Sequence, residues 1–154
     1  MTLSNKLLIK IVGLSLLFFS TLTLAASPAG LWKSIDDKTG KPRSLIRIME
    51  ADGAYSAVVE KGLRDGDTGD AVCDKCTDDR KGKKIIGMTI AKNLKAKEGD
   101  NPSREFVGGE ILDPENGKIY QCKIKLDETG NKLEVRGFIG MSLFGRSQTW
   151  LREE

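Results

Sequence analysis

The sequence predicts an all-β protein, a small antiparallel eight-stranded barrel in a single domain. Apolar and polar residues alternate with a period of two in eight short segments. Turn residues separate most of these segments by hairpin-sized gaps, and no segment carries a sustained helical stripe. Eight sequential strands of this kind favour a meander, whose closure into a barrel removes exposed strand edges. A two-sheet β-sandwich is the alternative that fits the same pattern.

The first three predicted strands are closely connected. Strand 30–35 ends at the turn 37–40, Asp-Lys-Thr-Gly, and strand 44–50 follows it. Asp52-Gly53 then forms a short hairpin turn into strand 54–61. A long polar stretch separates this strand from the fourth, which is predicted over 85–92.

The last four predicted strands are 104–112, 118–126, 132–139 and 147–152. The turns 113–117 and 127–131 and the glycine-bracketed loop 140–145 connect them. The alternation in 118–126 indicates which side chains face inward, because Tyr120, Cys122, Ile124 and Leu126 share one face. An eight-stranded barrel of this kind holds either packed side chains or one small ligand.

Residues 1–25 have the features of a cleavable signal peptide, which leaves 26–154 as the single barrel domain. Lys6 and Lys10 precede an apolar run, and small residues end at Ala25. A membrane anchor is the competing interpretation, but Lys10 interrupts the apolar run and no basic stop-transfer cluster follows. We therefore expect a periplasmic or secreted protein with no transmembrane anchor in the mature chain.

The charge of the mature chain argues against a nucleic-acid partner. Removing residues 1–25 takes away two lysines and no acid, so the formal net charge falls from +3 to +1. A nearly neutral domain has little electrostatic attraction for polyanions.

Six residues are candidates for contacting a ligand. Arg146, Gln148 and Trp150 share one face of the last strand, and Tyr120 is on the inward face of its own strand. Arg47 is flanked by apolar residues, where a guanidinium needs a carboxylate, a carbonyl or an anionic ligand. Arg136 is the weakest candidate, because its side chain could point outward.

Three cysteines, Cys73, Cys76 and Cys122, are expected in an oxidising compartment. We expect a disulfide in the long polar stretch, either Cys73–Cys76 or a bridge from one of these to Cys122. A structural zinc site lacks a fourth soft or nitrogen ligand, because the chain has no histidine. A thioredoxin-like pair is disfavoured because no helix pattern follows it.

The absence of histidine excludes several classes of enzyme. Neither a Ser-His-Asp nor a Cys-His nucleophile can be assembled. Carboxylate pairs stay available, but no spacing marks two of the 22 acidic residues. The acidic loop 65–70 departs from the calcium-loop pattern, so we predict no metal and no cofactor. The protein is expected not to be an enzyme.

Two resemblances support the barrel. Gly30-Leu31-Trp32 at the start of the first strand and Arg152 at the end of the last resemble the lipocalin pair, in which an arginine lies across the indole and caps one end of the core. Longer blocks, among them Gly108–Tyr120, Val135–Gly140 and Gly145–Trp150, resemble the bacterial DUF2147 family. That resemblance implies an exported envelope protein of lipocalin-like fold, and it supplies no ligand and no catalytic residues.

Two functions are compatible with these features. The first is an envelope carrier that holds a small amphiphilic or hydrophobic ligand in the barrel, with an anionic head near Arg47, Arg136 or Arg146. The second is a barrel with a packed core that acts through its surface, as an envelope interaction or stress-related module with a protein partner. A thiol-based redox protein is a third, weaker interpretation. The interior volume separates the first two, because a cavity of several hundred Å³ favours the carrier.

Overall fold

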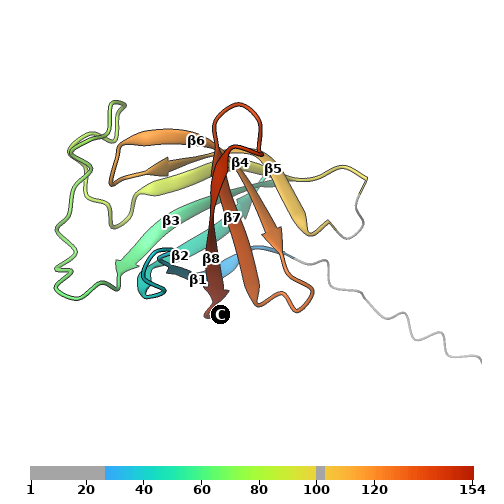
Figure 1. Ribbon diagram of the computed structural model, residues 1–154, viewed down its shortest axis with the longest axis horizontal. Helices are drawn as coiled ribbons and strands as arrows, with labels where there is room; N and C mark the ends of the chain where they lie inside the picture. The colour runs from blue at the N-terminus through green and yellow to red at the C-terminus, as the bar shows by residue number, and fades with distance from the viewer. Residues whose placement is uncertain (1–26, 100–102) are drawn as a thin grey trace, which may run out of the picture.

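The computed structural model describes residues 27–99 and 103–154, so the predicted signal peptide lies outside the described residues. Eight antiparallel strands form one closed barrel (Figure 1). Each strand pairs with its neighbours in sequence, and β8 pairs back with β1 through Trp32–Arg152 to Ile35–Thr149. This closure confirms the predicted fold class and excludes the two-sheet sandwich. The strands are β1 (Gly30–Ile35), β2 (Pro42–Ala51), β3 (Ala54–Gly62), β4 (Thr89–Ala96), β5 (Glu105–Asp113), β6 (Lys118–Leu126), β7 (Lys132–Phe138) and β8 (Gly145–Arg152).

The fourth strand begins four residues later than the sequence predicts, at Thr89 instead of residue 85. Gly87 has a φ of +85°, which ends regular pairing before it, so Ile85 and Ile86 belong to the preceding loop. Asn93 has a φ of +62° within the strand, and the register of β3 on β4 shifts nearby. This bulge interrupts the alternation of inward and outward side chains, so the sequence of β4 does not show the period-two pattern of a regular strand.

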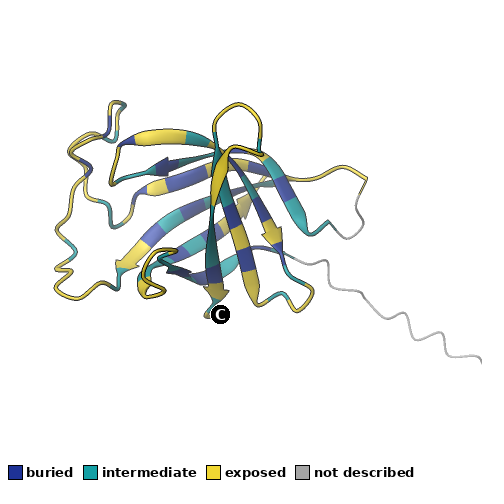
Figure 2. Ribbon diagram, viewed as in Figure 1, coloured by how far each residue is buried: buried dark blue, intermediate teal, exposed yellow. Residues whose placement is uncertain are grey.

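Buried and exposed residues alternate along the strands, which gives the barrel an apolar interior and a polar outer face (Figure 2). Large side chains fill the end of the barrel that carries the β2–β3, β4–β5 and β6–β7 turns, which we call the closed end. Tyr55 of β3 and Phe106 of β5 meet there edge to face, with ring centroids 4.9 Å apart. The buried core around them includes Trp32, Leu94, Leu126 and Leu133.

Arg152 covers the Trp32 indole at the closed end. Its guanidinium carbon lies 4.3 Å from the centroid of the indole ring, in the cation–π arrangement that the sequence resemblance implies. The guanidinium donates to the backbone carbonyls of Gly130 at 2.6 Å, Ala29 at 2.8 Å and Ser27 at 2.9 Å. Trp32 is 0% exposed and donates from Nε1 to the Pro28 carbonyl at 2.8 Å. The N-terminal segment, the β6–β7 turn and β8 are thereby fastened together.

A disulfide between Cys73 and Cys76 lies in the long connection between β3 and β4. This pairing settles the alternatives that the sequence leaves open, and Cys122 is a buried free thiol. The disulfide segment packs on the β5–β6 turn at Gly117, where a Cβ atom would lie 1.9 Å from the Lys75 carbonyl oxygen. Gly117 also has a φ of +71°, so glycine is needed there for both reasons.

Cys122 is expected to be chemically inert in the folded protein. Burial raises the pKa of its thiol to about 12, and its side chain is 1% exposed, so almost no accessible thiolate is present near pH 8. Iodoacetamide should therefore label no cysteine of the native protein, one after unfolding without reductant, and three after reduction. Mass spectrometry counts the labels, and rapid labelling of the native chain would contradict the expected inertness.

Candidate ligand-binding cavity

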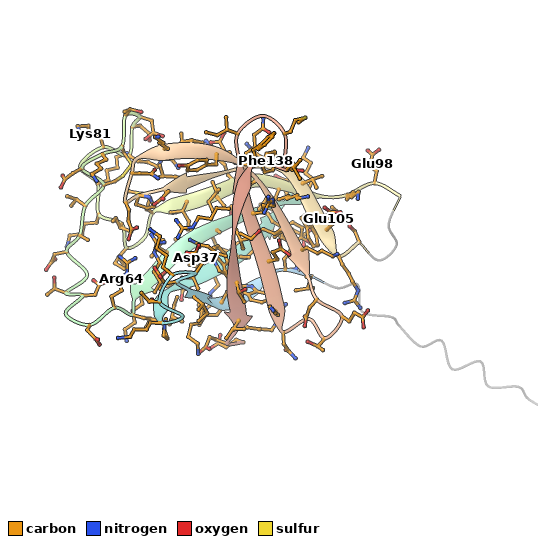
Figure 3. All side chains as sticks on the ribbon, viewed as in Figure 1. Asp37, Arg64, Lys81, Glu98, Glu105 and Phe138 are labelled. Carbon is orange, nitrogen blue, oxygen red and sulfur yellow. A yellow bond between two sulfur atoms is a disulfide. The ribbon has the colours of Figure 1, made fainter. Side chains whose placement is uncertain are left out.

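The barrel interior holds a cavity of about 430 Å³ that opens at the end opposite Arg152. The β1–β2, β3–β4, β5–β6 and β7–β8 connections surround this open end. In Figure 3, Asp37 and Arg64 lie toward the open end, whereas Glu98 and Glu105 lie toward the closed end. Apolar side chains form most of the wall, among them Ile46, Val59, Ile90, Ile111, Leu112, Val135 and Trp150.

A few polar groups lie among these apolar side chains. The hydroxyls of Ser34 and Ser44 are 2.8 Å apart and both side chains line the cavity. The Gln148 amide also lines it, and its Oε1 lies 3.5 Å from Trp150 Nε1. Tyr120 accepts a hydrogen bond at its hydroxyl from Asn116 Nδ2 at 3.1 Å. An apolar wall with a small number of polar groups is typical of small-molecule sites.

Four of the six predicted ligand-contacting residues line the cavity. Arg146, Gln148 and Trp150 follow one face of β8 from the open end inward, and Arg152 ends the same face beneath Trp32. Tyr120 contributes from β6. The period of two places these β8 side chains in one line, because alternate residues of a strand point the same way.

Arg47 and Arg136 lie away from the cavity wall, so the structure does not bring the three predicted arginines together. Arg47 is paired with Glu60, Nε to Oε1 at 2.7 Å, and with Glu154 at 3.4 Å. Its neighbours Ile46 and Ile48 are the buried residues of β2, so Arg47 belongs to the opposite, outer face. Arg136 donates from Nε to the Ser142 carbonyl at 2.8 Å and supports the β7–β8 loop.

Ion pairs surround the mouth of the cavity. Arg43 pairs with Glu115 at 3.2 Å and Arg64 pairs with the same carboxylate at 2.5 Å. Arg146 donates from Nε to Asp37 Oδ2 at 2.6 Å. The charged residues that line the cavity are three arginines and three carboxylates, so their formal charges sum to zero, and these residues are Arg43, Arg64, Arg146, Asp67, Asp113 and Glu115. Asp36 and Asp37 pair with Arg64 and Arg146 from the β1–β2 connection, which also carries Lys38 and Lys41.

Folding stability is expected to be constant near neutral pH and to fall in acid. The Arg146 side chain lowers the pKa of Asp37, and hydrogen bonds from Thr39 lower that of Asp36, both from 3.8. A carboxyl group whose pKa is lower in the folded protein than in the unfolded chain stabilises the fold at every pH above its unfolded pKa. This stabilisation is lost as the pH falls through the folded pKa. The chain has no histidine, so no side chain with an ordinary pKa between those of the carboxyl groups and neutral pH is present.

Urea unfolding midpoints measured between about pH 8 and pH 3 test this pH dependence. We expect one midpoint from about pH 8 to 5.5 and a decrease below about pH 4. Asp37→Asn should reduce the size of that decrease, because it removes one of the responsible carboxylates. A loss of stability that begins between about pH 7 and 6 would contradict the assignment.

Several cavity residues escape sequence-based prediction. Arg43, Arg64 and Asp67 reach the mouth from the first residues of β2 and from the β3–β4 connection. Ile85 and Ile86 line the cavity from the end of the same connection. Alternation identifies inward residues within a strand, but it carries no signal for a loop that folds back over the mouth. Tertiary contacts fix the path of that loop, among them the packing of the disulfide segment on Gly117 and the pairing of Arg64 with Glu115.

Metal-binding clusters and membrane-spanning helices are both absent from the described residues. Across 27–99 and 103–154, no three His, Cys, Asp or Glu side chains gather in a group that could bind a metal ion. Within the same residues, no helix has the length and apolar character needed to cross a membrane.

The closed barrel, the capped Trp32 and the cavity open at one end define a small lipocalin-like protein. The chain belongs to the DUF2147 family, described as uncharacterized proteins conserved in bacteria, whose model matches residues 30–152. It is similar in fold to the solved structure of protein HP1028 from the human pathogen Helicobacter pylori, which is described as a member of the lipocalin family. The two share 19% identity over 83% of this chain and 84% of that one, with a TM-score of 0.70. No curated protein matches the chain in sequence.

Proposed function

We propose that this protein is an exported, non-enzymatic carrier that binds one small hydrophobic or amphiphilic molecule inside its barrel. The observation that carries the proposal is the apolar cavity of about 430 Å³, which falls within the range of small-molecule sites. The alternative of a packed barrel acting only through its surface requires an interior without such a cavity. The volume therefore favours the carrier.

The charges at the mouth bear on the polar end of the ligand. Each arginine there already has a carboxylate partner, and the formal charges of the residues that line the cavity sum to zero. A strongly anionic head would have to break an existing ion pair, such as Arg146–Asp37. An uncharged or zwitterionic head would leave those pairs intact. We therefore expect a head of no net charge instead of the anionic head that the sequence suggests.

Two features support export. Residues 1–25 have the charge and hydropathy pattern of a signal peptide. The Cys73–Cys76 disulfide is of the kind that persists in an oxidising compartment such as the periplasm. Neither Cys73 nor Cys76 is exposed, and the Cys122 thiol has a raised pKa, so a thiol-based redox function has no reactive cysteine to use.

Fluorescence titration with N-phenyl-1-naphthylamine, an uncharged apolar probe, tests the binding proposal. We expect one site per chain, with energy transfer from tryptophan because Trp150 lines the cavity. Trp150→Phe should lower the transfer efficiency and leave the stoichiometry unchanged. The sulfonated probe 1-anilinonaphthalene-8-sulfonate should bind no more tightly than the uncharged one, because each arginine at the mouth is already paired with a carboxylate.

Native mass spectrometry of the protein purified from its own host provides the second test. A small molecule bound one to one, and displaced by the probe, is the expected result. The absence of probe binding together with an unliganded native mass would reject the carrier. Preferential binding of the sulfonated probe would overturn the assignment of an uncharged head.

A further inference from the structure

The β7–β8 loop, residues 139–144, has the largest exposed apolar surface of the described chain. Its exposed side chains are Ile139 at 67%, Met141 at 64%, Leu143 at 76% and Phe144 at 68%. No charged residue occurs from Phe138 to Gly145. The other exposed large apolar residues are at most 45% exposed and lie on four separate elements, and these are Met49, Val72, Ile119 and Leu151. Figure 2 shows the loop exposed along almost its whole length.

Part of the backbone of this loop is hydrogen-bonded within the protein. The Met141 carbonyl accepts from the Phe144 amide at 3.0 Å. Arg136 donates from Nε to the Ser142 carbonyl at 2.8 Å and from Nη2 to the Leu143 carbonyl at 3.1 Å. Three consecutive carbonyls therefore need no water, whereas the apolar side chains around them are exposed. Pairing of these carbonyls lowers the cost of placing the loop at an apolar surface, because an unpaired backbone group there is costly.

We propose that the β7–β8 loop inserts into the surface of a phospholipid bilayer. A second copy of the chain is a less suitable partner for this loop. The four exposed side chains offer on the order of 500 Å² of apolar surface, whereas a stable protein interface buries about 800 Å² on each partner. A lipid surface demands neither a minimum interface nor a complementary shape. Exposed apolar side chains can insert at the lipid interface, where the remaining polar backbone groups still reach water.

The position of the loop links docking to the cavity. Ile139 and Phe144 belong both to the exposed loop and to the cavity wall. Insertion of the loop would place the cavity mouth at the lipid surface, where apolar molecules partition. The exchange of ligand at that surface rests on the proposed carrier function, whereas the docking itself does not.

Vesicle flotation tests the docking with the chain beginning at Ala26, which retains every strand of the closed barrel. The variant is Met141→Ser with Leu143→Ser, because neither residue lines the cavity. The matched control is Met49→Ser with Leu151→Ser, which removes two exposed apolar side chains at the end of the barrel opposite the loop. We expect the wild type and the control to float with phosphatidylcholine vesicles, and the loop variant to partition at least tenfold less.

Raising the salt from about 0.1 to 0.5 M should leave flotation unchanged, because apolar insertion is not screened by ions. Equal melting temperatures for all three proteins show that the barrel is intact. Wild-type protein that stays out of the lipid fraction, or a loop variant that floats equally well, would overturn the proposal. So would a dimer in sedimentation that the loop variant abolishes, because it would assign the loop to a second copy.

Probe binding in lipid-free buffer keeps the two proposals distinguishable. The loop variant should bind N-phenyl-1-naphthylamine with wild-type affinity, since its substitutions lie outside the cavity wall. If the wild type floats but binds no probe, docking stands and the carrier is rejected. If it binds the probe but does not float, the carrier stands and docking is rejected.

Discussion

Trp32→Ala is expected to lower the free energy of unfolding by about 3–5 kcal/mol, a large part of the stability of a single small domain. Trp32 is completely buried, and the cavity left by its indole would lie beneath Arg152. The substitution also removes the hydrogen-bond donor of the Pro28 carbonyl and the ring beneath the guanidinium. The closed end would lose its packing and one of its hydrogen bonds to the N-terminal segment together.

Urea or guanidinium denaturation of the two tryptophan variants measures this effect. Trp150→Ala serves as the matched comparison, because Trp150 is equally large but has the ligand cavity on one side. Trp150→Ala should lower the free energy of unfolding by less than Trp32→Ala does, because the packing around Trp150 is already incomplete on the cavity side. Trp32→Phe should fall between wild type and Trp32→Ala, because it keeps a ring under Arg152. A cost below about 1 kcal/mol for Trp32→Ala would show that the closed end does not hold the barrel together.

Gly137→Trp is expected to abolish ligand binding while the barrel stays folded. Gly137 lines the cavity, and a Cβ atom there would meet Tyr120 Cβ at 3.4 Å and Ile111 Cγ2 at 3.5 Å. These are near-ordinary contacts, so the side chain can leave the backbone and extend into the open space. The indole would then occupy much of the 430 Å³ available to a ligand. We expect the affinity for N-phenyl-1-naphthylamine to fall at least tenfold, about 1.4 kcal/mol.

Two controls separate blocking from misfolding. Gly137→Ala adds only the tolerated Cβ and should bind the probe nearly as well as wild type. Lys132→Trp places the same indole on an exposed position of the same strand and should also bind normally. Wild-type affinity in Gly137→Trp, with an unchanged melting temperature, would mean that the probe binds somewhere other than the barrel interior.

The strand order and most strand boundaries are predictable because their signals are local. The turns at 52–53 and 127–131 separate alternating segments, and each strand then pairs with its sequence neighbour. The start of β4 is not predictable in this way, because its signal is not local. Ala91 and Leu94 are both buried although three residues apart, since the bulge at Asn93 changes which side chains face inward.

The candidate site is predictable in part for the same reason. The line of Arg146, Gln148 and Trp150 follows from alternation within one strand. The position of Arg47 does not, because the residues on both sides of it in sequence are apolar. Only the burial of Ile46 and Ile48 and the pairing of Arg47 with Glu60 show which face is outer. Arg43 and Arg64 reach the mouth from the start of β2 and from the long β3–β4 connection, and their shared carboxylate partner Glu115 is distant in sequence.

The sequence alone determined the strand pattern, the order of the hairpins and the closing contact between the first and last strands. These depend on neighbours a few residues apart and on one Trp–Arg pair at the two ends of the domain. Only the tertiary structure decided which cysteines pair, how the loop packs over the mouth and whether the interior is open. The volume left inside a barrel depends on how side chains from all eight strands pack across its axis. No pattern within one strand predicts that volume.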